Sequence, residues 1–370
     1  MKWKIAKLGK IAIIKTGKLD SNAAVIGGRY PFFTCDPNTL SIDVWAYDTE
    51  AVLLAGNNAS GNYTAKYYKG KFNAYQRTYI IESANEEELN IRYLCYALNQ
   101  QLRLLKTMSS GSTTKFLTVR MLDNLDIPLP SINIQTEVVN ILSAYDDLIE
   151  NNQKQIKLLE EAAQRLYKEW FVNLRFPGHE NTKIVDGVPE GWKKERLVDI
   201  AEIQYGYAFD GTLFNADKNG TPIIRIRNIP QAETMDYTTE HVSENYLVQN
   251  GEIIVGMDGE FHINACAGNT AYLVQRVCCI RPKNTEIKGW LLQAIYEPIK
   301  FFERTVVGAT VAHLGKKHLD SIYLLTSPEE FYEPFKTFFD KRLLLMNQNR
   351  KLREARDRLL PKLMSGEVEV

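Results

Sequence analysis

The stretch IENNQKQIKLLEEAAQRLYKEWF, residues 149–171, decides the architecture of this chain. Apolar residues recur in it at heptad spacing with charged residues between them, which predicts a long helix that packs against another helix. One seam position is an amide, Asn152, a residue type that fixes the register of paired helices at some cost in stability. The predicted seam rows are Leu142, Ile149, Ile156, Ala163 and Trp170, and Tyr145, Asn152, Leu159 and Leu166.

A second heptad stretch closes the chain, where a helix is predicted over residues 327–364. Its seam rows are Phe338, Leu345, Leu352 and Leu359, and Phe335, Arg342, Asn349, Arg356 and Leu363. Neither helix can bury its own seam rows, so we expect the two helices to pair antiparallel, with Asn152 and Asn349 setting the register. The alternative is that each helix lies on its own domain.

The segments that precede these helices repeat one another at a nearly constant offset. Trp3, Leu8, Ile11 and Gly17 recur as Trp192, Leu197, Ile200 and Gly206. Gln76-Arg77 recurs as Gln275-Arg276, each before a run of β-forming residues. A period of roughly 190–200 residues is too long for a solenoid and indicates duplication of a whole domain with its helix.

Each repeat predicts a mixed α/β domain. Strands are predicted at residues 11–14, 51–55, 77–81, 221–226 and 253–255, and a helix at 90–106. The expected fold class is therefore α+β, with two tandem mixed domains, a pair of long antiparallel coiled-coil helices between them, and a pseudo-twofold internal repeat. The predicted boundaries are 1–130 for the first domain, 131–178 for the central helix, 179–327 for the second domain and 328–370 for the last helix.

The composition fits two globular domains without an active site. Forty-five basic and 45 acidic residues give zero net charge, and 45% hydrophobic residues are enough for two cores. The five cysteines form no CxxC pair, which favours a reduced cytoplasmic protein over a zinc site, and no segment predicts secretion or membrane insertion. Motifs for a P-loop, a zinc protease or amino-methyl transfer are absent, so we expect no metal and no independent catalysis.

A basic and aromatic stretch in the first half is the strongest candidate for binding DNA. Residues 55–81 hold four basic side chains and no acidic one. Amides can bond adenine bidentately, and arginine or lysine can read guanine or hold phosphate. The candidate contacts are Asn57, Asn58, Lys66, Tyr68, Lys69, Lys71, Asn73, Gln76 and Arg77. The alternative is the polar rim of an ordinary hairpin.

Small and hydroxyl residues form a second candidate surface that recurs in both halves, at 109–115 and 307–317. Such loops let the backbone approach phosphates closely. Their candidate contacts are Ser112, Thr113, Lys115, Thr310, His313, Lys316 and Lys317, joined in the second half by Arg225, Arg227, Asn228 and Arg276. The alternation of IRIRN predicts a strand that places Arg225 and Arg227 on one face. Asp258, Glu260 and His262 could imitate metal ligands, but divergence in recognition is the better interpretation.

Several phrases of the sequence resemble the specificity subunits of type I restriction–modification enzymes over essentially the whole chain. They are AVLLAG and KGKFNAYQRTY in the first half, IPLPS before the central helix, VPEGW at the start of the second half, and LREARDRLLPKLMSGE at the end. The second half keeps only Gln275-Arg276 of the KFNAYQRTY phrase. The two halves are therefore expected to read different bases.

This resemblance implies two target-recognition domains, each of which reads one half of a split, asymmetric DNA site. It places Asn73, Gln76, Arg77, Ser112, Thr113 and Lys115 against DNA in the first domain, and Arg225, Arg227, Thr310, His313 and Lys316 in the second. It also implies that the helices set the spacer and dock methyltransferase subunits, two being expected, and through them restriction subunits. S-adenosylmethionine would then bind the methyltransferase, and this chain would hold no cofactor. A type IIB-like specificity subunit, a fused enzyme and a non-DNA coiled-coil adaptor are the rival interpretations.

Overall fold

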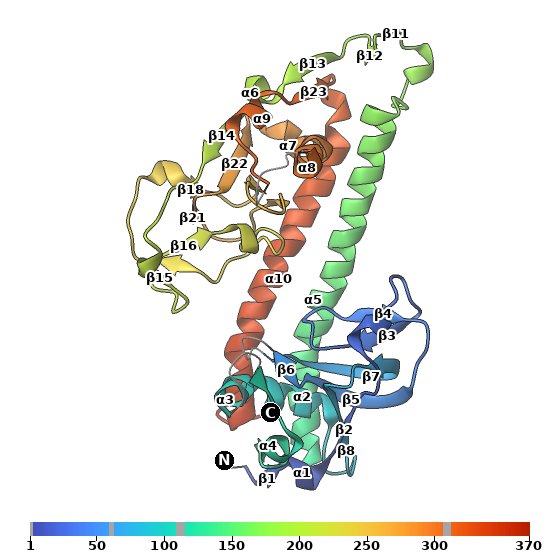
Figure 1. The fold of residues 1–370 in the computed structure, drawn as a ribbon, viewed down its shortest axis with the longest axis vertical. Coiled ribbons are helices and arrows are strands. Elements are labelled where there is room, and N and C mark those ends of the chain that lie inside the picture. Colours follow the sequence, from blue (N-terminus) through green and yellow to red (C-terminus); the bar gives the residue numbers. More distant parts are fainter. Residues whose placement is uncertain (1–2, 59–62, 109–114, 306–311) are drawn as a thin grey trace. The chain divides into compact units, whose positions relative to one another are not determined.

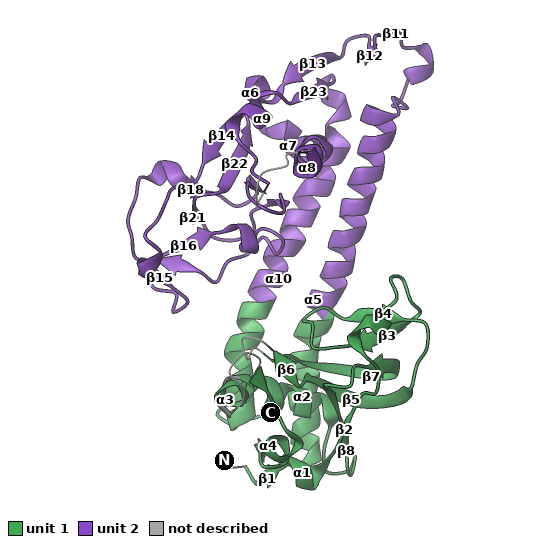
Figure 2. Cartoon of the chain, viewed as in Figure 1, with its two compact units in different colours: residues 1–147, 353–370 green, residues 148–352 purple. Residues whose placement is uncertain are grey.

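The protein is described by a computed structural model that covers residues 3–58, 63–108, 115–305 and 312–370 (Figure 1). The chain divides into two compact units, residues 1–147 with 353–370, and residues 148–352 (Figure 2). Helix α5 (Ile132–Tyr167) and helix α10 (Glu333–Ser365) each contribute residues to both units. The compact units therefore include parts of the helices, whereas the sequence treated the helices as separate segments.

The first unit is built on a six-stranded sheet with the order β2-β8-β5-β7-β3-β4. Its strands are β2 (Ala12–Thr16), β3 (Tyr30–Phe33), β4 (Leu40–Ile42), β5 (Tyr47–Ala55), β7 (Ala65–Ala74) and β8 (Thr78–Ser83). Only β3 and β7 pair in parallel within this sheet. Two short ladders complete the unit, β1 (Ile5–Lys7) with β10 (Asp126–Pro128) and β6 (Asn57–Asn58) with β9 (Lys115–Phe116).

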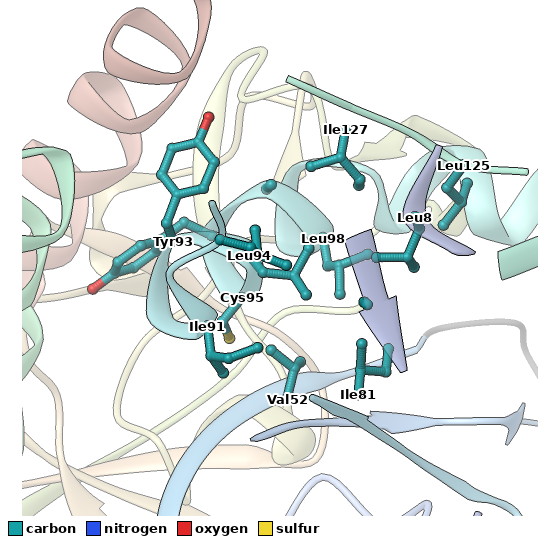
Figure 3. Packing of buried hydrophobic residues seen from close by; sticks show 14 of the residues in the cluster. Leu8, Val52, Ile81, Ile91, Tyr93, Leu94, Cys95, Leu98, Leu125 and Ile127 are labelled. Atoms are coloured by element: carbon teal, nitrogen blue, oxygen red, sulfur yellow. The ribbon is translucent and has the colours of Figure 1, made fainter. Parts of the chain in front are cut away.

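Helix α2 (Ile91–Gln100) covers part of this sheet and fills the core of the unit. It starts where the Asn90 side chain accepts a hydrogen bond of 3.1 Å from the Tyr93 amide, so that one terminal N–H is satisfied. Leu94 and Leu98 are fully buried with residues of the strands (Figure 3). The prediction of one helix over 90–106 is wrong in detail, because α2 ends before Gln101 and α3 (Leu102–Met108) begins after it. Helices α1 (Leu8–Ile11) and α4 (Val119–Asp123) are single short turns.

The second unit contains two main sheets, with the orders β14-β22-β19-β20 and β15-β17-β16-β21-β18. The first comprises β14 (Ala201–Tyr205), β19 (Ile253–Gly256), β20 (Ile263–Ala265) and β22 (Val277–Pro282). The second comprises β15 (Phe214–Asn215), β16 (Thr221–Ile224), β17 (Tyr237–Thr238), β18 (Leu247–Val248) and β21 (Ala271–Leu273). Two ladders pair β11 (Ile184–Val185) with β12 (Val188–Pro189) and β13 (Lys193–Arg196) with β23 (Tyr323–Thr326). The helices are α6 (Leu197–Ile200), α7 (Lys288–Ala294), α8 (Tyr296–Thr305) and α9 (Lys316–Asp320).

The same framework occurs in both units, which confirms the duplication expected from the sequence. In each, a short helical turn leads into a strand, β2 or β14, that pairs antiparallel with β8 or β22. A glycine follows that strand. A Cβ atom on Gly17 would lie 2.2 Å from the Ala74 carbonyl oxygen, and one on Gly206 would lie 2.2 Å from that of Val274. Only glycine allows so close an approach, which explains why both halves place it there.

The helix pair in the second unit is antiparallel and carries the two seam amides predicted from the heptads. The Asn152 amide donates a hydrogen bond of 2.9 Å to Asn349 Oδ1, and Asn349 donates one of 3.3 Å to the Ile149 carbonyl. Both amides are almost fully buried, at 3% and 2% exposure. Eight residues further along α5, Glu160 pairs with Arg342, which precedes Asn349 on α10. The contacts advance along α5 while they go back along α10, so the two helices are antiparallel.

In each unit an arginine of α10 pairs with an acid of α5, and this pair contacts strand β20 in the second unit and helix α2 in the first. In the second unit Arg342 is 8% exposed; its Nε lies 2.7 Å from Glu160, and its Nη2 donates to Asn264 Oδ1 at 2.6 Å. In the first unit Arg356 lies 2.7 Å from Asp146, which also accepts a hydrogen bond from the Tyr96 hydroxyl. None of the described helices has the length and apolar character needed to cross a bilayer.

Candidate nucleic-acid interface

The first unit brings together polar residues from three separate segments beside the Gln76-Arg77 turn. The Arg77 carbonyl accepts a hydrogen bond of 2.8 Å from Gly56, which places this turn next to Asn57. Asn57 and Asn58 pair with Phe116 and Lys115 in the β6–β9 ladder. We call Asn57, Asn58, Gln76, Arg77 and Lys115 the first edge. Gln76 and Arg77 are exposed, and the other three are partly exposed.

One partly exposed thiol lies against this edge although the sequence did not select it. Cys35 Sγ lies 2.7 Å from Asn57 Oδ1 and 3.5 Å from the Arg77 carbonyl. These contacts hold the Asn57 amide on the side of the turn. Cys35 follows β3, 42 positions before Arg77 in the chain, so no local pattern could have joined the two residues.

The candidates on β7 are less available than the acid-free sequence indicated. Lys69 lies 2.8 Å from Glu50, its neighbour across the sheet. Lys66 bonds the Asp36 carbonyl and the Thr39 hydroxyl, and burial lowers the pKa of its ammonium group. Local absence of acids in the sequence therefore does not leave Lys66 and Lys69 without partners in the fold.

Asn73 and Tyr68 are also used inside the first unit. Asn73 is 4% exposed; its amide donates to the Val44 carbonyl at 3.3 Å, and its oxygen accepts from the Ala74 amide at 3.0 Å. The proposal that Asn73 contacts a base is wrong for this conformation, because strand β7 turns that side chain inward. Tyr68 packs against the rings of Phe33 and Phe72. Lys71 remains exposed, 4.7 Å from the centre of the Trp45 ring.

The second unit has a corresponding edge with different side chains. Asp258 occupies the position of Asn57. Each residue lies just after a corresponding strand, β19 or β5, and each pairs with a later segment, Asp258 with His313 and Asn57 with Phe116. Asp258 Oδ1 lies 2.5 Å from His313 Nδ1, and Asp258 Oδ2 lies 3.2 Å from Arg276 Nε. Arg276 Nη1 is 3.3 Å from His313 Nδ1. We call Asp258, Arg276 and His313 the second edge.

The arginines of the IRIRN segment do not lie on a strand. Strand β16 ends at Ile224, and Ile226–Asn228 forms a 3-10 turn instead. Asn228 Oδ1 accepts a hydrogen bond of 2.8 Å from the Arg225 amide, which closes that turn. Arg227 forms an ion pair with Asp236, and Arg225 lies over the Phe214 ring. The expectation of two arginines on one strand face is therefore wrong, because a side-chain cap competes with continued strand pairing.

The remaining candidates divide between exposed lysines and residues outside the described ranges. Lys316 and Lys317 are exposed at the start of α9, where Lys316 lies 2.7 Å from Asp320. Ser112, Thr113 and Thr310 lie outside the described residues.

Comparison with known proteins assigns the chain to a family. A family model described as the type I restriction modification DNA specificity domain matches residues 1–161 and 189–330. The chain belongs to this family. Its type I specificity domains are thus present twice, in agreement with the duplicated framework and with the resemblance seen in the sequence.

Curated relatives in this family are specificity subunits of type I restriction enzymes. The chain is 32% identical to the EcoDI specificity subunit of Escherichia coli over 224 residues, 54% of this chain and 49% of that protein. It is 27% identical to the MjaIX specificity subunit of Methanocaldococcus jannaschii over 296 residues, 75% of this chain and 68% of that protein. The matched region thus spans about half of the first relative's length.

A solved structure of the same kind shares the fold. The S subunit of a type I restriction–modification system from M. genitalium superposes with a TM-score of 0.61 at 17% identity, covering 98% of this chain and 96% of that one. Similarity at this level of identity concerns the fold alone.

Proposed function

We propose that this chain is the DNA sequence-specificity subunit of a type I restriction–modification complex. One observation carries the proposal: the specificity-domain family matches both repeats, and the corresponding edges of these repeats differ in chemistry. Three amides, an arginine and a lysine occupy the first edge, whereas an aspartate, an arginine and a histidine occupy the second. Two such edges would read the two different halves of an asymmetric site.

The helices are proposed to fix the spacer between these half-sites. Helix α5 has 36 residues and α10 has 33, and buried amides hold their register within the second unit. A heptad inserted into both helices, at 147/148 and 352/353, keeps the seam pattern and lengthens each helix by about 10.5 Å. Since one base pair rises about 3.4 Å, the modified sites should gain roughly three base pairs in their spacer.

Mapping of modified adenines in cells that carry the chain with its methyltransferase tests this proposal. The wild-type chain should direct methylation to a split motif, and the double heptad insertion should leave both half-sites unchanged. A motif whose spacer did not change would contradict the role of the helices. A four-residue insertion in α5 alone serves as the control, because it shifts the heptad seam and should abolish modification.

The chain is proposed to recognise DNA without catalysing a reaction. Methyltransferase subunits would dock on it, restriction subunits would join through them, and S-adenosylmethionine would bind the methyltransferase. Flipping and methylating the adenine would then be the task of that partner. The purified chain should transfer no methyl group from S-adenosylmethionine, and its affinity for duplex DNA should fall steeply as salt rises. An affinity that did not change with salt would favour a coiled-coil adaptor instead.

A further inference from the structure

The three side chains of the second edge form a connected cluster at the surface of the second unit. Asp258 is 29% exposed at its side chain, and it contacts both Arg276, 48% exposed, and His313, 45% exposed. These residues come from three segments, the turn after β19, the turn before β22 and the segment before α9. A carboxylate that joins two exposed donors restricts their rotamers before any ligand arrives.

The backbone at Arg276 shows that this position is unusual. Its φ is 74°, in the left-handed region that favours glycine and asparagine. The Val277 amide bonds the Val274 carbonyl at 3.1 Å, so Arg276 is the third residue of a tight turn. Glycine would fit this turn without strain. A long charged residue held there points to a function for its side chain.

We infer that Arg276 reads the guanine of a G·C pair in the second half-site and that Asp258 is the residue that positions it. This inference rests on the proposed function and names the base-edge chemistry of one recognition domain. The ion pair with Asp258 is made at Arg276 Nε, and Arg276 Nη1 lies 3.3 Å from His313 Nδ1. Each terminal nitrogen carries two hydrogens, so both keep one for a forked contact. Guanine O6 and N7 match that fork, the commonest specific contact between arginine and a base.

A phosphate contact fits this geometry less well than a base contact. A phosphate beside Arg276 would also lie near the carboxylate of Asp258, which repels it. Asp258 itself could accept from the amino group of cytosine, which belongs to the same base pair. The cluster therefore combines donors and an acceptor in the manner needed for a base pair, whereas a phosphate site needs donors alone.

The first edge supplies a matched control for this assignment. Arg77 occupies the position of Arg276, with Asn57 in place of Asp258. Within the described residues the Arg77 side chain makes no ion pair or hydrogen bond. Asp258→Asn converts the second edge toward the first, and Arg77→Gly removes the equivalent arginine from the other half-site.

The test uses the full chain in complex with its methyltransferase and a library of duplexes with randomised half-sites. Methylated duplexes are sequenced for wild type, Arg276→Gly, Asp258→Asn and Arg77→Gly. Arg276→Gly should reduce the preference for G·C at one base pair of one half-site by about 5- to 150-fold. Asp258→Asn should reduce the preference at that same base pair by a smaller factor, and Arg77→Gly should alter only the other half-site.

Two outcomes would overturn the inference and leave the proposed function intact. In the first, Arg276→Gly lowers methylation of all sequences by the same factor, as loss of a phosphate contact would. In the second, Arg276→Gly keeps the wild-type motif. Because glycine suits the φ of this turn, and Asp258→Asn leaves Arg276 in place, a folding defect would not explain either result. If the wild-type complex showed no sequence preference, the proposed function itself would fail.

Discussion

The two recognition units place a Gln-Arg turn at corresponding strands, but Arg276 has a positive φ that Arg77 lacks, and different side chains surround the two arginines. In the first, Arg77 extends without a partner among the described residues, beside an asparagine that a cysteine thiol contacts. In the second, Arg276 is paired with Asp258 and adjoins His313. The comparison therefore separates two roles within each unit. The glycines and strands keep the framework constant, whereas the side chains at three edge positions differ and would determine which bases are recognised.

The largest loss of stability should come from substitution of the framework glycines, and it should be equal in both units. Gly17→Ala and Gly206→Ala would each bring a methyl group within 2.2 Å of a backbone oxygen, which forces the strands apart. We expect each to lower the free energy of unfolding by about 3 kcal/mol or more, at the upper end of overpacking effects. Gly211→Ala is the control, because a Cβ atom there meets nothing within 4 Å.

Chemical denaturation of the three variants measures this effect. A large loss for Gly17→Ala beside a small one for Gly206→Ala would mean that the two frameworks are not equivalent at this crossing.

The next largest effect on stability should differ between the two units, because the α10 arginine that pairs with α5 is more buried in the second unit than in the first. The Arg342 side chain is 9% exposed and the Arg356 side chain is 27% exposed, while each contacts two polar partners. Arg342→Ala should cost about 2 kcal/mol, since it removes a buried guanidinium that bonds Asn264 and pairs with Glu160, whose side chain is 40% exposed. Arg356→Ala should cost about 1 kcal/mol or less, as is usual for solvent-accessible ion pairs. Equal losses in a denaturant titration would show that burial does not control these contacts.

The seam of the helix pair could be predicted from the sequence because its signal is periodic. Heptad spacing alone placed Asn152 and Asn349 on one seam, and the structure brings their amides to 2.9 Å. The duplicated glycines were visible for a similar reason, since Gly17 and Gly206 recur at the same offset as the residues before them.

The partners of the individual edge residues could not be predicted, since they depend on contacts between distant segments. Glu50 reaches Lys69 across the sheet, and Asp258 meets Arg276 only after β19 and β22 have paired. Asn73 looked like a reader of bases because its phrase is rich in polar residues, but the strand face that it occupies is buried. Alignment of the two halves on Gln76-Arg77 and Gln275-Arg276 would not have matched Asp258 with Asn57, because Asn57 lies 20 residues before Arg77 and Asp258 only 18 before Arg276.

A smaller effect is expected for stability when the second edge is simplified. Arg276→Gly removes an ion pair that is largely solvent-accessible, and it relieves a left-handed backbone that costs on the order of 1 kcal/mol. The thermal midpoint of the variant should therefore equal or slightly exceed that of the wild type, even though its discrimination falls. Arg77→Gly gains no such relief. A midpoint for Arg276→Gly several degrees below wild type would show that Arg276 is mainly structural.

The smallest effect concerns the thiol that only the first edge contains. Burial raises the pKa of Cys95, Cys266 and Cys278 to about 12, and it raises the pKa of Cys279 as well, so these thiols stay protonated and unreactive near neutral pH. Cys35 is partly exposed and should be the site that iodoacetamide alkylates first. Because Cys35 contacts Asn57, a duplex bound at the first edge should slow this alkylation several-fold. Mass spectrometry of the complex with and without duplex measures the rate, and Cys35→Ser is the control for labelling elsewhere. An unchanged rate at saturating duplex would mean that DNA does not cover the first edge, and the comparison between the two edges would then lose its functional meaning.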